Sequence, residues 1–228
     1  MGADRYEVAV IGGGQAGLAI GYYLAQQGRR FTILDAGAEP AAAWRARWDS
    51  LRLFTPARFN SLPGLAFPGD PDHYPTRDEV VAYLTDYAER FALPVERSSR
   101  VTGLRVHDGG YRVEVGERSL HADQVVVATG PFQVPRVLPF ARRLDGSVVQ
   151  RHSTEYRRPA DVPNGRVLVV GGGNTGFQIA HELAASRAVH LAIGSRQLPL
   201  PQRILGRDLF DYLHATGLLK VTVGSPLG

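Results

Sequence analysis

The chain has 228 residues, of which 44% are hydrophobic and 21% charged, a balance that is typical of a globular protein and excludes a largely disordered chain. The net charge of +4 favours anionic ligands, but no Lys/Arg run is long enough to predict nucleic-acid binding. The absence of cysteine excludes disulfides and a Cys-x-x-Cys redox centre within the chain. Neither a signal peptide nor an apolar stretch of membrane-spanning length is recognisable, so we expect a cytoplasmic protein with no membrane partner.

The first chemical signal in the chain is a Gly-x-Gly-x-x-Gly motif over residues 12–17. It follows an apolar run at residues 8–11, typical of a buried strand, and precedes a helical pattern that should stop at Gly28, before a strand at 31–34. In such a βαβ unit the first glycine permits a tight turn, the second lets the backbone approach a pyrophosphate, and the third lets helix and strand pack. The helix N-terminus then offers free N–H groups to the phosphates. The predicted cofactor-binding residues here are Gly12, Gly14, Gln15, Ala16 and Gly17.

The same pattern occurs a second time, after a predicted strand at residues 167–170. A helix is expected over 177–183 and a strand over 189–193, followed by a helix at 206–216 and a third strand at 218–223. Two copies separated by about the length of a domain predict two dinucleotide sites rather than one. The cofactor-binding residues predicted for the second site are Gly171, Gly173, Asn174, Thr175 and Gly176.

The residues after the second strand of each unit distinguish the two expected ligands. Asp35 can accept hydrogen bonds from ribose hydroxyls and would repel a 2′-phosphate, which favours FAD or NAD in the first site. The second unit has Ser195 and Arg196 in place of an acid, and a hydroxyl beside a guanidinium suits the 2′-phosphate of NADPH. The alternative for Arg196 is an ordinary surface residue.

The region between the two units contains a long irregular loop, a helix and a hairpin. Residues 50–75 are rich in proline and glycine and predict a loop, whereas residues 76–91 predict a helix with Thr76 and Glu79 as its capping box. Segments 101–106 and 111–115 suggest a β-hairpin, and 125–127 a further buried strand. The proline-rich stretch 131–165 is expected to be the crossover between units.

These elements predict an α/β fold with two dinucleotide-binding, Rossmann-like βαβ units that have parallel sheets, plus a small β-hairpin element. The expected organisation is an FAD-binding domain over residues 1–140, a linker over 141–164 and part of an NADPH-binding domain over 165–228. No histidine has a metal-ligand spacing, so no metal site is predicted.

The chain resembles the flavin-containing monooxygenases, also called class B flavoprotein monooxygenases, and in particular their short bacterial relatives. The resemblance covers nearly the whole chain and is carried by the two glycine motifs, Trp44-Arg45, Ala128-Thr129-Gly130, and the stretches FNSLPGLAFPGDPDHYPTRDEVVAYL and RHSTEYRRP. It implies that the first motif binds FAD and the second NADPH. It also implies that hydride passes to the flavin, that oxygen is activated at flavin C4a, and that it is transferred to a small organic substrate.

The resemblance also assigns individual residues. Asn60 aligns with the family's asparagine near the flavin and is the predicted catalytic residue, although a loop asparagine that only makes a turn is the alternative. Trp44 is either a flavin contact or core. The remaining predicted cofactor-binding residues are Trp44, Arg45, Val101, Thr129 and Gly130. The expected partners are a small-molecule substrate and O₂, and the resemblance allows a homodimer.

Two departures from the family keep other functions open. The family fingerprint around Gly146 and His152 has a longer gap here, and family members continue well beyond residue 228, so the chain is expected to lack their C-terminal portion. A truncated dinucleotide-binding module with no turnover of its own is therefore the alternative function. A disulfide reductase is disfavoured by the lack of cysteine, and a plain NAD-dependent dehydrogenase by the presence of two cofactor motifs.

Overall fold

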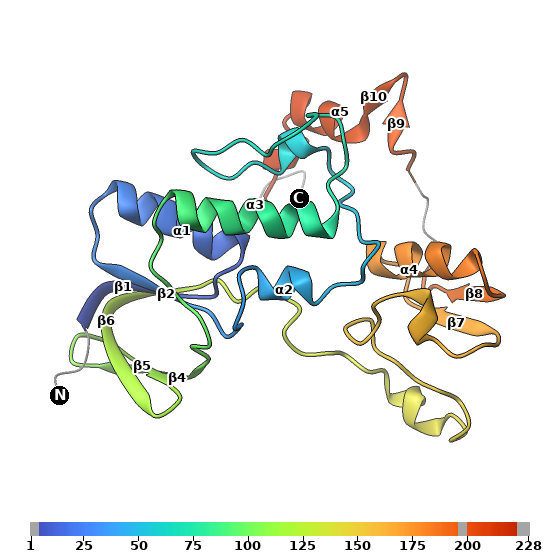
Figure 1. Cartoon of the computed structure of the whole chain (residues 1–228), viewed down its shortest axis with the longest axis horizontal. Helices are drawn as coiled ribbons and strands as arrows, with labels where there is room; N and C mark the ends of the chain where they lie inside the picture. Colours follow the sequence, from blue (N-terminus) through green and yellow to red (C-terminus); the bar gives the residue numbers. More distant parts are fainter. Residues whose placement is uncertain (1–4, 196–199, 223–228) are drawn as a thin grey trace.

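The computed structural model describes residues 5–195 and 200–222. Its N-terminal unit is built on a six-stranded sheet with the order β3-β2-β1-β6-β5-β4 (Figure 1). The strands β1 (Arg5–Ile11), β2 (Phe31–Leu34) and β3 (Val95–Glu96) are parallel to one another, and β6 (Arg118–Val127) is parallel to β1. The helices α1 (Gln15–Gln26) and α3 (Arg77–Arg90) lie side by side on one face of this sheet.

The predicted hairpin is confirmed as β4 (Val101–His107) and β5 (Gly110–Val115), which pair antiparallel. The strand expected only at 125–127 is longer than predicted, because β6 takes part in two ladders. Its first half pairs antiparallel with β5 and its second half parallel with β1. The hairpin is therefore part of a three-stranded meander that continues directly into the nucleotide-binding sheet.

The second unit contains the predicted strand–helix–strand sequence. β7 (Val167–Val170) and β8 (Val189–Ala192) are parallel, and α4 (Asn174–Ala184) connects them. The helix predicted at 206–216 is confirmed only as α5 (Leu209–Ala215), because β9 (Arg203–Ile204) and β10 (Arg207–Asp208) form a tight hairpin before it.

The strand predicted at 218–223 is wrong within the described residues. Leu218–Lys220 form the 3₁₀ turn η4, after Gly217 ends α5 in a left-handed conformation with φ 73°. Apolar residues alone do not make a strand, since a strand also needs a neighbour to pair with, and no partner for this segment occurs in the described part of the chain. Residue 223 lies outside the described residues.

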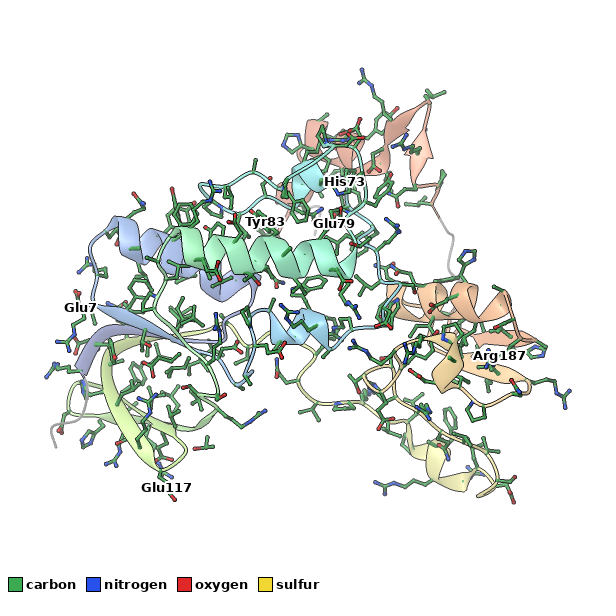
Figure 2. The ribbon with its side chains drawn as sticks, viewed as in Figure 1. Glu7, His73, Glu79, Tyr83, Glu117 and Arg187 are labelled. Atoms are coloured by element: carbon green, nitrogen blue, oxygen red, sulfur yellow. The ribbon has the colours of Figure 1, made fainter. Side chains whose placement is uncertain are left out.

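The long loop at 50–75 is irregular, as predicted, apart from the 3₁₀ turn η1 (Ala57–Phe59) and two isolated bridges. The capping box of α3 is confirmed, with the side chains and backbone N–H groups of Thr76 and Glu79 bonded reciprocally. Tyr83 fixes the loop to α3, because its hydroxyl donates to Leu65 O at 2.8 Å and accepts from Leu62 N at 2.6 Å (Figure 2). The crossover at 131–165 contains only short 3₁₀ turns, η2 (Pro139–Arg143) and η3 (Pro159–Asp161).

The buried core consists of three clusters. The first fills the space between the sheet and the helices α1 and α3, and the second lies among the meander strands, β1 and β2. The third joins the two units, and its buried members are Trp48, Leu51, Tyr156, Ile179 and Leu183. Trp48, at 4% exposure, is thus a core residue of the contact between the units. No helix among residues 5–195 and 200–222 is long and apolar enough to cross a membrane.

Candidate dinucleotide-binding sites

The first glycine turn joins β1 to α1, and its three motif glycines face different surroundings. Gly12 has φ 113°, and a methyl group there would lie 2.4 Å from Ala128 O. A methyl group on Gly17 would lie 1.9 Å from Gly12 O, whereas one on Gly14 would meet nothing within 4 Å. The chain itself therefore requires the outer two glycines, and Gly14 borders open space that a ligand can occupy.

The N-terminus of α1 is chemically suited to an anion. Gly14 is the N-cap residue and supplies no side-chain hydrogen bond to the first turn of the helix. The first N–H groups of a helix have no intrahelical acceptor, and the helix dipole places partial positive charge there. Gln15 and Ala16 begin the helix and are exposed at this end. A pyrophosphate above Gly14 would accept hydrogen bonds from these free N–H groups.

Asp35 directly follows β2, beside the same turn. Its carboxylate oxygens accept hydrogen bonds from the backbone N–H groups of Gly13 at 2.6 Å and Gly37 at 2.7 Å. Asp35 thus braces the glycine turn, a role that sequence reasoning missed, and each oxygen keeps lone-pair capacity for a ribose hydroxyl. A hollow opens at this point. Its lining includes Gly13, Leu18, Asp35, Glu39, Ala41 and Arg97.

The structure places most of the other residues predicted for the first site near this turn. The indole Nε1 of Trp44, on the short helix α2 (Ala42–Arg45), donates to Gln15 Oε1 at 3.1 Å. Arg45 donates to Pro40 O at 2.9 Å.

Thr129 and Gly130 follow the carboxyl end of β6, directly after the residue whose carbonyl faces Gly12. Val101 is different, because it begins β4 at the edge of the sheet and packs its half-buried side chain against the second core cluster.

Asn60 follows η1, and its side chain is engaged within its own loop. Its amide nitrogen donates to Thr55 O at 3.0 Å and Pro56 O at 2.9 Å, and its Oδ1 accepts from Thr55 Oγ1 at 2.6 Å. These bonds use both amide hydrogens and leave one lone pair of Oδ1. These contacts are those expected of an asparagine that stabilises its own loop. A role of Asn60 toward a ligand stays a prediction.

The second glycine turn resembles the first, except that a methyl group on Gly171 would meet nothing within 4 Å. Gly171 has φ 123°, a methyl group on Gly176 would lie 1.9 Å from Gly171 O, and a methyl group on Gly173 would meet nothing within 4 Å. Gly173 caps α4 without a side-chain hydrogen bond, and Asn174 and Thr175 form the first turn of that helix. Ser195 lies exposed just beyond β8, whereas Arg196 lies outside the described residues.

Sequence reasoning also missed the residues that tie the two sites together. Gln178, two positions after Gly176, exchanges two hydrogen bonds with the backbone of Arg52. Asp49 pairs with Arg77 at 2.6 Å and with Arg157 of the linker at 3.3 Å. These partners are far apart in the sequence, so no local pattern could have predicted them. No group of three or more metal-ligating side chains occurs within residues 5–195 and 200–222.

Comparisons with known proteins agree with this geometry. The family model described as "Pyridine nucleotide-disulphide oxidoreductase" matches residues 9–199. The "Uncharacterized oxidoreductase CzcO-like" of Geobacillus kaustophilus is 46% identical over 97% of the chain and 64% of its own length. The "Probable indole-3-pyruvate monooxygenase YUCCA9" of Arabidopsis thaliana is 32% identical over 88% of the chain and 50% of its own length.

Among solved structures, the "Flavin-containing monooxygenase from Stenotrophomonas maltophilia" superposes with a TM-score of 0.84 at 34% identity, covering 98% of this chain and 66% of that one. The chain therefore spans between half and about two thirds of the length of these relatives. The predicted resemblance to flavin monooxygenases and the predicted α/β fold are confirmed. By its fold, its two glycine turns and the family model that covers most of its length, the chain belongs to the pyridine nucleotide-disulphide oxidoreductase family.

Proposed function

We propose that the chain forms the FAD- and NADPH-binding part of an oxidoreductase of the flavin monooxygenase kind. The observation that carries the proposal is the pair of similar glycine turns, in each of which the middle glycine of the motif borders open space at the N-terminus of a helix that has no side-chain cap. Two such turns in one chain fit an electron donor and an electron acceptor better than they fit a single cofactor.

The first turn is the proposed FAD site. The α1 N-terminus above Gly14 would hold the pyrophosphate, and the carboxylate of Asp35 would accept ribose hydroxyls while it continues to brace Gly13. The bound flavin would supply the hydride acceptor and the chemistry toward O₂. Trp44, which is hydrogen-bonded to Gln15, would cover one side of this site. Asn60 would offer the remaining lone pair of its Oδ1 to the bound cofactor.

The second turn is the proposed NADPH site. No acid occupies the position after β8, where Ser195 lies exposed, so this unit has no carboxylate there to repel a 2′-phosphate. The expected Arg196 contact to that phosphate is a proposal from the sequence alone. Arg196→Ala should weaken NADPH binding more than NADH binding, and equal losses would contradict the role.

The relatives support a monooxygenase more than a disulfide reductase. The flavin monooxygenase and the YUCCA9 protein match this chain at more than 30% identity, and the chain contains no cysteine to act as a dithiol centre. We therefore propose a small organic substrate and O₂ as reactants. A cytoplasmic location and a homodimer stay predictions.

The test is the visible absorption spectrum of the purified chain, recorded before and after NADPH is added without oxygen. Flavin bands that NADPH bleaches would support the proposal, and oxygen uptake and substrate oxidation would then be measured. A colourless protein that takes up no added FAD would favour the second candidate, a binding module incomplete by itself. The chain spans 64% of the length of the CzcO-like relative.

A further inference from the structure

The two glycine turns can serve one reaction only if their units are held at a fixed separation. Hydride transfer needs reacting atoms within about 3–3.5 Å, so a small change between units strongly affects the rate. The contact between the units is therefore the part of the molecule that would set this geometry. Where this contact reaches the helix of the second glycine turn, it is formed by the segment 51–53 of the N-terminal unit and by α4 of the second unit.

Residues 51–53 behave as a short extended strand with partners on both sides. On one side Arg77 N donates to Leu51 O at 3.0 Å and Leu53 N donates to Pro75 O at 2.8 Å. On the other side Arg52 N donates to the Oε1 of Gln178 at 3.2 Å, and the Nε2 of Gln178 donates to Arg52 O at 2.9 Å. The side-chain amide thus pairs with Arg52 as a neighbouring peptide group would in a sheet.

This pairing links the second glycine turn to the first unit along a short rigid path. Gln178 is on the first turns of α4, two residues after Gly176, whose close packing on Gly171 fixes the start of the helix. At the other end of the path, Arg77 begins α3, which is packed into the core of the N-terminal unit. The two amide bonds are therefore a direct, directional link between α4 and the first unit.

The loop at 50–75 also binds the second unit at α5, where Arg58 donates twice to the carboxylate of Asp211, but these bonds do not reach α4. The other contacts near α4 are less able to fix its orientation. The apolar cluster that contains Leu51 and Ile179 is non-directional and tolerates small sliding. The pair of Asp49 and Arg157 is exposed, with 40% exposure of each side chain, and it joins the linker rather than α4. The amide of Gln178 has both a donor and an acceptor in fixed geometry, which defines register as well as contact.

We propose that Gln178 is a positioning residue that holds the second nucleotide-binding unit in register with the first, so that the two cofactors meet productively. The kinetic part of this inference rests on the proposed function, whereas the structural part does not. The informative variant is Gln178→Met, which keeps the length and the apolar stem but can form neither amide bond. Gln178→Glu retains an acceptor for Arg52 N and places a carboxylate against Arg52 O. The matched control is His181→Ala, because His181 is an exposed residue of the same helix.

The structural test measures the separation of the units directly. The chain has no cysteine, so spin labels can be attached only where cysteines are introduced, at the exposed residues Gln26 of α1 and Ala184 of α4. The pair Gln26→Cys and Ala184→Cys should give a narrow distance distribution by pulsed electron spin resonance. Gln178→Met and Gln178→Glu should broaden or shift it, and His181→Ala should not. A distribution as narrow and at the same distance in all variants would overturn the inference.

The kinetic test measures the limiting rate at which NADPH reduces bound FAD in rapid mixing without oxygen. Gln178→Met should lower this rate by at least about tenfold, with FAD content, the Kd for NADPH and reduction by dithionite unchanged. A fall that follows loss of FAD would indicate a merely structural role and contradict positioning, as would an unchanged rate. If the unmodified chain binds FAD but NADPH does not reduce it, the proposed function fails, and the distance measurement still decides the role of Gln178.

Discussion

Gly17→Ala should destabilise the fold, whereas Gly14→Ala should mainly weaken FAD binding, because only Gly17 packs against the chain. A methyl group on Gly17 would lie 1.9 Å from the backbone oxygen of Gly12, so the turn or the helix must move. Overpacking of this kind costs about 1–3 kcal/mol. For a chain of this size each kcal/mol lowers the Tm by about 2–4 °C, so Gly17→Ala should lower it by roughly 2–12 °C.

Gly14→Ala should instead leave the protein without FAD almost as stable as before. Gly14 has φ −79° and ψ −173°, which any residue adopts, and its methyl group would enter open space. The loss of a favourable N-cap residue and the reduced entropy of the unfolded chain are each worth about 0.5–1 kcal/mol and have opposite signs. The change in Tm should therefore stay within about 2 °C.

The order of the variants in FAD affinity should differ from their order in Tm. Gly14→Ala should weaken FAD binding, and Gly14→Val should abolish it, because larger side chains fill the space through which a pyrophosphate approaches the helix N-terminus. The assays are thermal unfolding of the FAD-free protein by circular dichroism and titration with FAD followed by flavin fluorescence. Retention of FAD by Gly14→Val, or a Tm of Gly17→Ala equal to that of the unmodified chain, would refute the reasoning.

Three further predictions concern single side chains. Asp35→Asn should lower the free energy of unfolding by about 1–3 kcal/mol in urea titration, because an amide cannot accept both backbone N–H bonds; an unchanged midpoint would contradict this. Burial raises the pKa of the Tyr87 hydroxyl in the folded protein. The contribution of this group to the stability of the fold is therefore fully present below about pH 10 and is lost at higher pH. Tyr87→Phe, which removes the bond to Pro63 O, should cost about 0.5–1.5 kcal/mol at neutral pH and reduce the alkaline loss; an equally steep alkaline loss would argue against it. Burial of Asp208 would raise its pKa, but the hydrogen bond from Tyr74 and those from its other donors outweigh it and hold the pKa below its usual value. Its contribution is present above about pH 4 and lost as the pH falls, so Asp208→Asn should flatten the acid side of the stability curve.

The sequence by itself predicted the parts of the molecule that depend on short spacing. Both glycine turns, the helices after them and the capping box at Thr76 and Glu79 lie where the local patterns place them. A turn that needs a positive φ, or a helix end that needs an acceptor, is specified by residues a few positions apart. The same reasoning predicted that Gly14 rather than Gly17 faces the ligand.

Tertiary structure alone decided the features that depend on distant partners. β6 extends beyond the apolar run at 125–127 because it pairs with both β5 and β1. Residues 218–220 form a turn because no strand lies beside them among the described residues. Asp35 braces Gly13, and the amide of Gln178 meets the backbone of Arg52 across 126 positions of sequence. A hydrogen bond between such residues depends on where the whole chain brings them, and hydrophobic periodicity carries no information about that placement.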